Sequence, residues 1–324
     1  MVVLAAYAET LNLEDPLAGL VIGERPEPTP PNDRWTTIQV RAASLNHHDL
    51  WSLRGVGLPA ERLPMILGCD ASGIDQDGNE VIVHSVIGDD DWGGDETLDP
   101  KRTLLSEHHQ GTLAQQLTVP TRNLLPKPPQ LSFEQAACLP TAWLTAYRML
   151  FTRGRVTPGQ TVLVQGSSGG VATALIVLAS HAGIRVWATG RSEQKRELAL
   201  RLGADGAFEP GARLPERVDA VMETTVAATW SQSVKSLKPG GTIVIAGATT
   251  GDASPAQLTR IFYLQLSVVG STMGTREELE RLMRFMVERK IEPVIAGTLP
   301  LQEARQGFEA MLAGETQGKI VFSV

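Results

Sequence analysis

The stretch VLVQGSSGGVATALIVLASHAGIRVWATGRSEQK, residues 162–195, decides the fold of this chain. An apolar β-type run at 162–164 leads into a glycine-rich turn, a helical segment follows, and a second apolar strand spans 184–189. This order of strand, glycine turn, helix and strand is typical of the βαβ unit that binds dinucleotides. Gly169 and Gly170 would let the backbone approach a pyrophosphate, and N–H groups at the helix N-terminus would stabilise its charge. The stretch therefore predicts a nucleotide-binding α/β domain.

The end of the second strand indicates which nucleotide is bound. An NAD site usually places Asp or Glu there to hold the ribose 2′-hydroxyl, but this chain reads Thr-Gly-Arg-Ser, with Gly190 and Arg191, and Lys195 one helical turn later. Two cations without the carboxylate favour the 2′-phosphate of NADPH over NADH. The alternative is that both are solvated surface charges, and the neighbouring Glu193 and Glu197 weaken the argument from charge.

The composition excludes several classes of protein. Of the 324 residues, 42% are hydrophobic and 20% charged, and the net charge of −7 argues against nucleic acid or an anionic membrane as partner. Two cysteines, Cys69 and Cys138, exclude a disulfide framework and fit a reducing compartment. The sequence shows neither a signal-peptide pattern nor an apolar run near the roughly 20 residues that span a bilayer. We therefore expect a cytoplasmic protein that acts on a small molecule.

The pattern of predicted elements changes along the chain. Up to about residue 130 it is β-like, with alternating runs such as 36–41 and 80–84. A helix is predicted over about 132–153, which Pro140 would kink or divide. From residue 161 strands alternate with helices, which predicts a doubly wound parallel sheet. Its six candidate strands are 162–164, 184–189, 206–208, 218–223, 242–246 and 266–271.

A set of motifs in a fixed order carries a family resemblance. They are NHHD (46–49) with Arg54-Gly55, LGCDASG (67–73), GTLAQQLTVP (111–120), TAWLTAYRML (141–150), GSSGGVA (166–172), LKPGGTIVIAGATTG (237–251), GSTMGT (270–275) and QGKIVF (317–322). With them the chain resembles the medium-chain dehydrogenase/reductase superfamily, and within it the zinc-free quinone oxidoreductase-like branch. The resemblance implies a GroES-like β-rich catalytic domain, 1–131 and 274–324, that encloses a Rossmann cofactor domain, 132–273.

The metal positions of this family depart from the zinc pattern here. Where zinc-dependent members have a Cys, this chain has Asn46, and where they have Gly-His-Glu it has Gly-Cys-Asp, with Cys69 and Asp70. Their third ligand falls at about the position of Thr141. A catalytic zinc requires three protein ligands of N, S or carboxylate type, so we expect no metal. The loop 88–107, where a structural zinc lobe would lie, contains no cysteine and is acidic.

The adjacent histidines His47 and His48 leave two possibilities open. Either could complete an improvised metal site with Cys69 and Asp70, although adjacent residues of a strand point to opposite faces. Either could also shuttle a proton during the reaction. The resemblance places the site in a cleft near Asn46 and residues 141–145.

The expected chemistry follows from the missing metal. Without a Lewis acid, hydride transfer to a plain ketone is difficult, whereas in an enone or quinone the developing charge reaches a carbonyl oxygen that needs only hydrogen-bond donors. Asn46 is the candidate donor to the substrate carbonyl or cofactor ribose; alternatively it is a buried Asn bonded to backbone. Trp51 replaces the Tyr that quinone reductases often have, and would form an apolar wall.

The sequence thus favours an NADPH-dependent oxidoreductase that transfers hydride to a quinone or α,β-unsaturated carbonyl. Two alternatives stay open: an alcohol/ketone dehydrogenase with an unconventional metal site, and a non-catalytic NADPH-binding protein. By resemblance the cofactor contacts are Thr145, Ser167, Ser168, Gly169, Gly170, Val171, Gly190, Arg191, Lys195, Gly247, Ser271, Met273 and Lys319, the last approaching the pyrophosphate. Turn geometry or packing could equally explain Gly247, Ser271 and Met273. The apolar last Rossmann strand, 266–270, predicts a homodimer, because an uncovered edge strand tends to pair.

Overall fold

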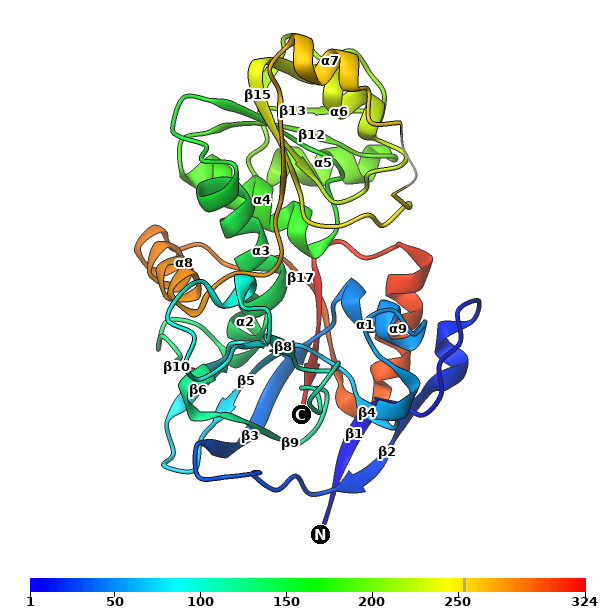
Figure 1. Cartoon of the computed structure of the whole chain (residues 1–324), viewed down its shortest axis with the longest axis vertical. Helices are drawn as coiled ribbons and strands as arrows, with labels where there is room; N and C mark the ends of the chain where they lie inside the picture. Colours follow the sequence, from blue (N-terminus) through cyan, green and yellow to red (C-terminus); the bar gives the residue numbers. More distant parts are fainter. Residues whose placement is uncertain (253–254) are drawn as a thin grey trace. The chain divides into compact units, whose positions relative to one another are not determined.

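The structure is a computed structural model that describes residues 1–252 and 255–324 (Figure 1). The chain divides into two compact units. The first contains Met1–Ala142 and Met273–Val324, and the second contains Trp143–Thr272.

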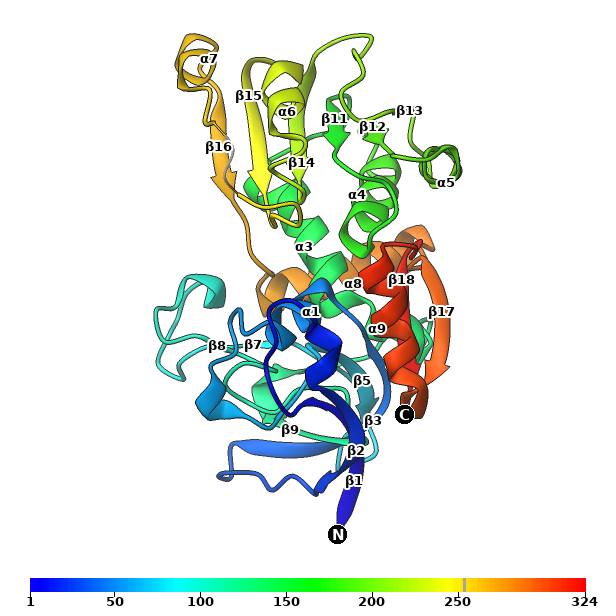
Figure 2. The same cartoon turned by 90° about the vertical axis from the view of Figure 1, so that its right-hand side faces the viewer.

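The second unit is built on a six-stranded sheet in the order β13-β12-β11-β14-β15-β16, in which all neighbours are parallel. All six strands predicted from the sequence are present, which confirms the doubly wound sheet. The order changes direction between β11 and β14, the place where such sheets bind ligands. Figure 2 shows β16 and α7 at one edge of the sheet and β13 with α5 at the other. The strands are β11 (Thr161–Val164), β12 (Arg185–Thr189), β13 (Gly206–Phe208), β14 (Val218–Glu223), β15 (Leu237–Ile245) and β16 (Ser267–Gly270).

Four helices alternate with these strands. They are α4 (Gly170–His181), α5 (Glu193–Arg201), α6 (Trp230–Ser236) and α7 (Leu258–Tyr263). Helix α4 is apolar on nearly all sides and buried from Ala172 to Ala179, as expected of a helix packed within a domain. Leu163, Val221 and Ile243, from three adjacent strands, share one core cluster with α6. None of the helices among the described residues has the length and apolar character that a bilayer crossing requires.

The first unit consists of β-sheets with a few helices, as the resemblance implies. A three-stranded sheet has the order β2-β1-β4, and a seven-stranded sheet has the order β10-β6-β5-β3-β18-β17 with β9 paired to β3. The strands are β1 (Val2–Ala8), β2 (Leu20–Pro26), β3 (Trp35–Ser44), β4 (Met65–Ile66), β5 (Asp70–Ile74), β6 (Glu80–Val83), β7 (Val86–Ile87), β8 (Thr103–Leu104), β9 (Gln116–Pro120), β10 (Leu124–Pro126), β17 (Ile295–Pro300) and β18 (Lys319–Ser323). The helices are α1 (His47–Leu53), α2 (Phe133–Ala137), α8 (Arg276–Arg289) and α9 (Ala304–Ala313).

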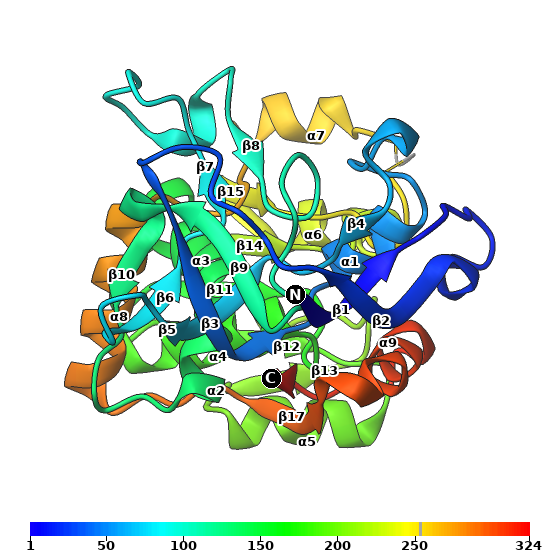
Figure 3. The same cartoon turned by 90° about the horizontal axis from the view of Figure 1, so that it is seen from below.

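Both ends of the chain contribute to this unit. Strand β18 pairs antiparallel with β3, with Val321 opposite Ser44, and parallel with β17. Figure 3 shows β3, β5, β6 and β9 lying side by side, with both termini in the same unit. The pairing brings Lys319, at the start of β18, next to the end of β3 and so to the site described below.

The helical segment predicted over 132–153 is divided. Its parts are α2, a π-helical turn Leu139–Trp143 that contains Pro140, α3 (Leu144–Tyr147) and a second π-helical turn Arg148–Arg153. Proline has no N–H to continue the α-helical ladder, which explains the break. Helix α2 packs against β3 and β5, so the first unit extends to Ala142, whereas the sequence places the boundary after residue 131.

Candidate active site

The glycine turn between β11 and α4 presents unsatisfied backbone donors. Gly166 has φ +86°, in the left-handed region that favours glycine, and Gly169 is the N-cap of α4 with no side chain capping the helix. A Cβ atom added at Gly166 or Gly169 would meet no atom within 4 Å, so the turn faces open space. The N-terminus of this twelve-residue helix therefore has the geometry that suits an anion, and the pyrophosphate expected there stays a prediction.

A buried chain of hydrogen bonds supports this turn from below. The backbone N–H of Gly166 donates to Thr189 Oγ1 at 2.9 Å, and Thr189 Oγ1 donates to Gln165 Oε1 at 2.8 Å. Gln165 Nε2 donates to Ser233 Oγ at 3.0 Å, and Ser233 Oγ donates to Glu223 Oε2 at 2.7 Å. The chain links the carboxyl ends of β11, β12 and β14, and so fixes the position of the turn.

Glu223 is the residue of this network that the sequence analysis missed. Its carboxylate is fully buried and also accepts from the N–H groups of Thr225 and Val226, at 2.9 and 3.0 Å, and from Thr229 Oγ1. Val226 has φ +67°, which a β-branched residue adopts only under strong constraint. The available signal was a Glu that closes a mainly apolar strand, in which Asp219 is the other charged residue, since a buried carboxylate requires donors.

The corner predicted to hold the 2′-phosphate gathers a third cation. Arg191 is exposed and Lys195 half-buried, and burial together with the nearby Arg191 charge lowers the pKa of Lys195. Arg196, which the sequence analysis missed, donates to the Gly190 carbonyl at 2.9 Å and pairs with Glu209 at 3.5 Å. An anion between Arg191 and Lys195 would relieve their mutual repulsion, whereas Arg196 already has Glu209 as its partner.

Gly190 itself has no room for a side chain. An added Cβ would lie 2.8 Å from Ser167 Oγ and 3.1 Å from the backbone nitrogen of Arg196. Ser167 Oγ in turn donates to the Lys195 carbonyl at 2.9 Å, which ties the glycine turn to α5. A carboxylate at position 190 could therefore enter only if this contact shifted.

In the first unit, the side chain of Lys319 is buried and bonded to three acceptors. Its ammonium is 2% exposed and donates to the Leu45 carbonyl at 2.7 Å, to Asn46 Oδ1 at 2.6 Å and to Asp70 Oδ2 at 3.2 Å. The sequence analysis expects Lys319 to approach the pyrophosphate. Three acceptors instead take up all three ammonium protons, because β18 places this side chain beside β3 and β5.

The side-chain amide of Asn46 is likewise hydrogen-bonded within the protein. Its side-chain nitrogen donates to Asp70 Oδ2 at 2.8 Å and more weakly to the Ser44 carbonyl at 3.4 Å. Ser44 Oγ also donates to Asp70 Oδ2, at 2.8 Å, while Asp70 Oδ1 has no partner among the described residues. Of the two interpretations of Asn46 left open by the sequence, the buried hydrogen-bonded one describes this structure better than a donor to substrate.

The two histidines lie in helix α1, not in a strand as the sequence analysis assumes. Successive helix residues diverge by about 100°, so they face different surroundings. His47 is exposed, its ring is 6.0 Å from that of Trp51, and partial burial and Arg54 lower its pKa. Trp51 also lies under the Arg54 guanidinium, 5.2 Å from ring centre to carbon.

His48 joins a cluster with Cys69 and Glu107. Its Nε2 lies 2.9 Å from Glu107 Oε1 and its Nδ1 lies 3.5 Å from Cys69 Sγ. Burial lowers the pKa of His48, but its interactions with Cys69, Glu107 and Asp49 outweigh burial and hold the pKa well above its usual value. Burial raises the pKa of Cys69, so its sulfur is a thiol at neutral pH.

The remaining predicted cofactor contacts lie in helix α3 and in the segments that follow β15 and β16. Thr145 is buried in α3, and a Cβ at Gly247 would lie 3.4 Å from the Thr224 carbonyl. Ser271 Oγ is buried without a partner among the described residues, which marks a hydroxyl available to a ligand or water. Met273 has φ +49° and groups with the first unit.

Comparison with known proteins places these features in a family. The family models described as "Alcohol dehydrogenase GroES-like domain" and "Zinc-binding dehydrogenase" match residues 32–129 and 170–288. The acryloyl-coenzyme A reductase of Sulfurisphaera tokodaii is 29% identical over 330 residues, which cover 94% of this chain and 97% of the relative.

Two solved structures extend the match to both units. The crystal structure of an NAD-dependent alcohol dehydrogenase is 34% identical, with a TM-score of 0.92 over 99% of each chain. The structure of the 2-octenoyl-CoA carboxylase reductase CinF in complex with NADP and 2-octenoyl-CoA is 25% identical, with a TM-score of 0.89, and covers 99% of this chain and 87% of that chain. The chain therefore belongs to the medium-chain dehydrogenase/reductase superfamily of oxidoreductases.

Proposed function

We propose that this chain is an NADPH-dependent oxidoreductase that transfers hydride to an activated carbon–carbon double bond, in an α,β-unsaturated carbonyl compound or a quinone, without metal. The observation that carries the proposal is that Asn46 and Asp70, at positions where the resemblance places the zinc site, are bonded in a buried network with the Lys319 ammonium. The similarity to an acryloyl-coenzyme A reductase supports an unsaturated thioester as the substrate class.

The residues at these positions do not fit a catalytic zinc. Asn46 and Asp70 already share a cation, the Lys319 ammonium, and burial keeps Cys69 a thiol, whereas zinc binds the thiolate. His48 and Cys69 lie close enough to suggest the improvised site, but within residues 1–252 and 255–324 no three His, Cys, Asp or Glu side chains are arranged to hold a metal ion. No step of the proposed reaction therefore passes through a metal.

The second unit fits NADPH, which supplies the hydride when it is bound. The uncapped N–H groups of α4, with Ser167, Ser168 and Val171 around them, orient the pyrophosphate in this proposal, and Arg191 and Lys195 hold the 2′-phosphate. Thr145, Gly247, Ser271 and Met273 would line the nicotinamide end. The unpartnered hydroxyl of Ser271 is the observation that supports this group.

In the first unit we assign the substrate side to two residues of α1, the exposed His47 and the half-buried Trp51. Trp51 offers a flat apolar face to a conjugated substrate. The lowered pKa of His47 leaves a neutral imidazole at pH 7, whose N–H can donate a hydrogen bond to the carbonyl oxygen that gains charge during hydride transfer. Asn46 acts indirectly in this proposal, by holding the N-terminus of α1 against β5.

We also propose that the protein is a cytoplasmic homodimer. Strand β16 ends the sheet, and among the described residues it pairs only with β15; Val268 on it is 44% exposed. On the neighbouring helix α7, Leu258 and Phe262 are 69% and 70% exposed. Such an apolar edge suits pairing with a second copy across a two-fold axis. The two free, buried cysteines support a reducing compartment.

A substrate panel tests the proposed activity. Quinones, enones and enoyl thioesters are offered with NADPH, and oxidation of NADPH is followed; we expect turnover with at least one class and none with saturated ketones. Elemental analysis of the same preparation and assays after chelation accompany the panel. Oxidation of simple alcohols that depends on stoichiometric zinc would contradict the proposal and support the alcohol/ketone dehydrogenase, which the similarity to an NAD-dependent alcohol dehydrogenase favours.

A further inference from the structure

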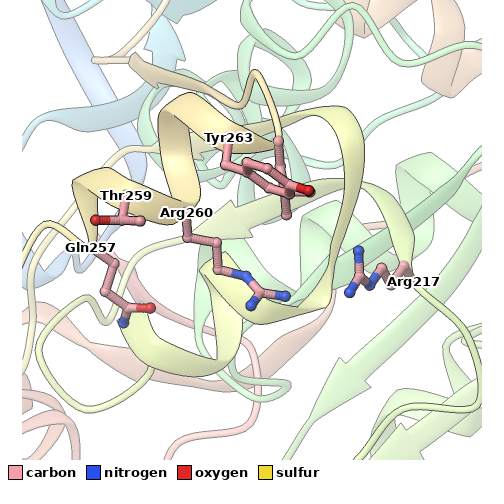
Figure 4. A pocket seen from close by; sticks show the side chains of 6 residues that line it. Arg217, Gln257, Thr259, Arg260 and Tyr263 are labelled. Carbon is pink, nitrogen blue, oxygen red and sulfur yellow. The ribbon is translucent and has the colours of Figure 1, made fainter.

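A separate cavity of about 560 Å³ opens beside α7 in the second unit (Figure 4). It is lined by Arg217, Gln257, Thr259, Arg260, Tyr263 and Leu264. Arg217 immediately precedes β14 and Leu264 lies shortly before β16, so the cavity borders the amino ends of parallel strands. The glycine turn lies at the opposite, carboxyl edge. The volume is in the range of small-molecule sites, and the place excludes the dinucleotide as its occupant.

Two arginines converge in this cavity without a counter-charge. Figure 4 shows the guanidinium of Arg260 extending toward that of Arg217. Arg217 is exposed and has no hydrogen bond or ion pair with any described residue. Arg260 makes one long hydrogen bond, from Nη2 to the Lys235 carbonyl at 3.4 Å, while its Nε is buried without a partner among the described residues. The nearest carboxylates along the chain are engaged elsewhere, since Glu216 pairs with Arg185 at 2.7 Å and Asp219 pairs with Lys238 at 2.9 Å. Like charges held together in this way favour an anion between them.

The rest of the lining indicates the shape of that anion. The ring of Tyr263 stands over the cavity and is 77% exposed, so it offers a face for stacking. Gln257 and Thr259 add polar groups on the side opposite Arg217. We propose that this cavity binds a small phosphate monoester that carries a flat ring. The two guanidinium forks would hold the phosphate and Tyr263 the ring.

The proposed homodimer surface does not account for this cavity. Leu258 and Phe262, four residues apart, lie on one face of α7. Arg260 and Leu264 lie on another face, about 200° around the helix from Leu258 and Phe262 respectively. The cavity therefore has an occupant other than a second copy of the chain in this proposal, and its two arginines favour an anion.

Phenyl phosphate is the probe that tests the proposal. Calorimetric titration is carried out on the full chain saturated with NADP⁺, which blocks anion binding at the N-terminus of α4. We expect saturable binding of phenyl phosphate, weaker binding of inorganic phosphate, which lacks the ring, and none of phenol, which lacks the charge. Failure of phenyl phosphate to bind would overturn the proposal.

Matched variants locate the binding. Arg217→Ala and Arg260→Lys should each weaken the binding of phenyl phosphate about tenfold. The lysine keeps the positive charge but cannot form the two parallel hydrogen bonds of a guanidinium. Arg213→Ala, an exposed arginine four residues from Arg217 that does not line the cavity, should bind as the wild type does. Equal affinity in all four proteins would overturn the proposal. It would also be overturned if the two cavity variants changed the sedimentation mass but not the binding, since the arginines would then belong to an interface between copies.

Discussion

The two units use their polar groups in opposite ways. At the glycine turn of the second unit, the first N–H groups of α4 have no side-chain cap and face open space. In the first unit, Asn46 and Lys319 donate to neighbours inside a buried network. Donors left unsatisfied in a built turn are available to a ligand, whereas donors satisfied internally hold the fold together. The family's site positions thus leave backbone donors open to a ligand in one unit and brace the structure in the other.

The largest expected effect is a loss of stability when the buried network of the first unit is broken. Lys319→Met removes the ammonium and leaves Asp70 as an uncompensated buried charge beside Asn46. Breaking a buried pair in this way costs about 3–5 kcal/mol of unfolding free energy. Urea unfolding of the variant and the wild type measures the loss.

Lys238→Met is the matched control, because Lys238 pairs with Asp219 at 2.9 Å near the surface. We expect it to cost less than about 1 kcal/mol. The double variant Lys319→Met with Asp70→Asn should recover part of the stability, since it also removes the stranded charge. If Lys319→Met were no more destabilising than the control, the network would not be the brace described here.

The second prediction concerns the binding side. The double variant Arg191→Ala with Lys195→Ala should bind NADPH about 30- to 150-fold more weakly, a loss of about 2–3 kcal/mol in binding free energy. Its affinity for NADH should be nearly unchanged. The reason is that both cations face the 2′-phosphate, which NADH lacks, and partial exposure limits the gain. Dissociation constants for both cofactors on both proteins provide the measurement.

Arg201→Ala is the control on the same helix, because Arg201 reaches only Glu197, at 3.8 Å, on the surface. Equal loss of NADPH and NADH in the double variant would make Arg191 and Lys195 ordinary surface charges. A Gly190→Asp change does not serve as a clean cofactor switch, since its Cβ would collide with Ser167 Oγ. It should weaken both cofactors.

Local pattern explains why the second unit could be predicted from the sequence. The six strands follow from short apolar runs, and the turn follows from Gly169 and Gly170 between a strand and a helix. Each strand is read from its own short run, and the turn with its two flanking strands lies within about 35 residues, so no distant partner is needed to interpret these signals. The resemblance supplied the first unit's fold, but not what its side chains do.

Distant pairing explains why the side-chain contacts of the first unit could not be predicted from the sequence. Lys319 meets Asn46 only because β18 pairs with β3, across more than 270 positions of sequence. The assumption that His47 and His48 lie in a strand failed because Asn46 and Asp49 form a capping box that starts α1. Glu223 was overlooked for a different reason: its donors, from Thr225 to Ser233, lie close by in sequence, but a strand-ending Glu does not by itself show that the chain folds back over it.

A third, smaller effect tests whether the glycine turn depends on its buried support. Glu223→Gln keeps the shape of the side chain but turns an N–H group toward donors such as Val226 N or Ser233 Oγ. We expect a loss of about 1–2 kcal/mol in unfolding free energy and about tenfold weaker binding of NADPH and NADH alike. The equal loss distinguishes this positioning residue from Arg191. Glu216→Gln, on a surface pair with Arg185, should change neither quantity, and unaltered cofactor binding in Glu223→Gln would refute the support role.

The smallest expected effect on stability concerns the cluster of His48, Cys69 and Glu107 in the first unit. This cluster is partly exposed: the side chains of His48 and Glu107 are 22% and 23% accessible. The pKa of His48 is raised in the folded protein, so the stability gained from its proton is fully present below the unfolded value near 6.5 and is lost as pH rises through the folded value. Glu107→Gln removes the carboxylate that accepts from His48 and should cost about 1 kcal/mol at pH 6, with a cost that shrinks toward pH 9. Urea unfolding at several pH values between 6 and 9 measures this difference, and Glu197→Gln, on the exposed pair with Arg201, should show no such slope. A cost that is constant over this range would mean that Glu107 contributes packing alone and that the His48 proton does not help to brace the first unit.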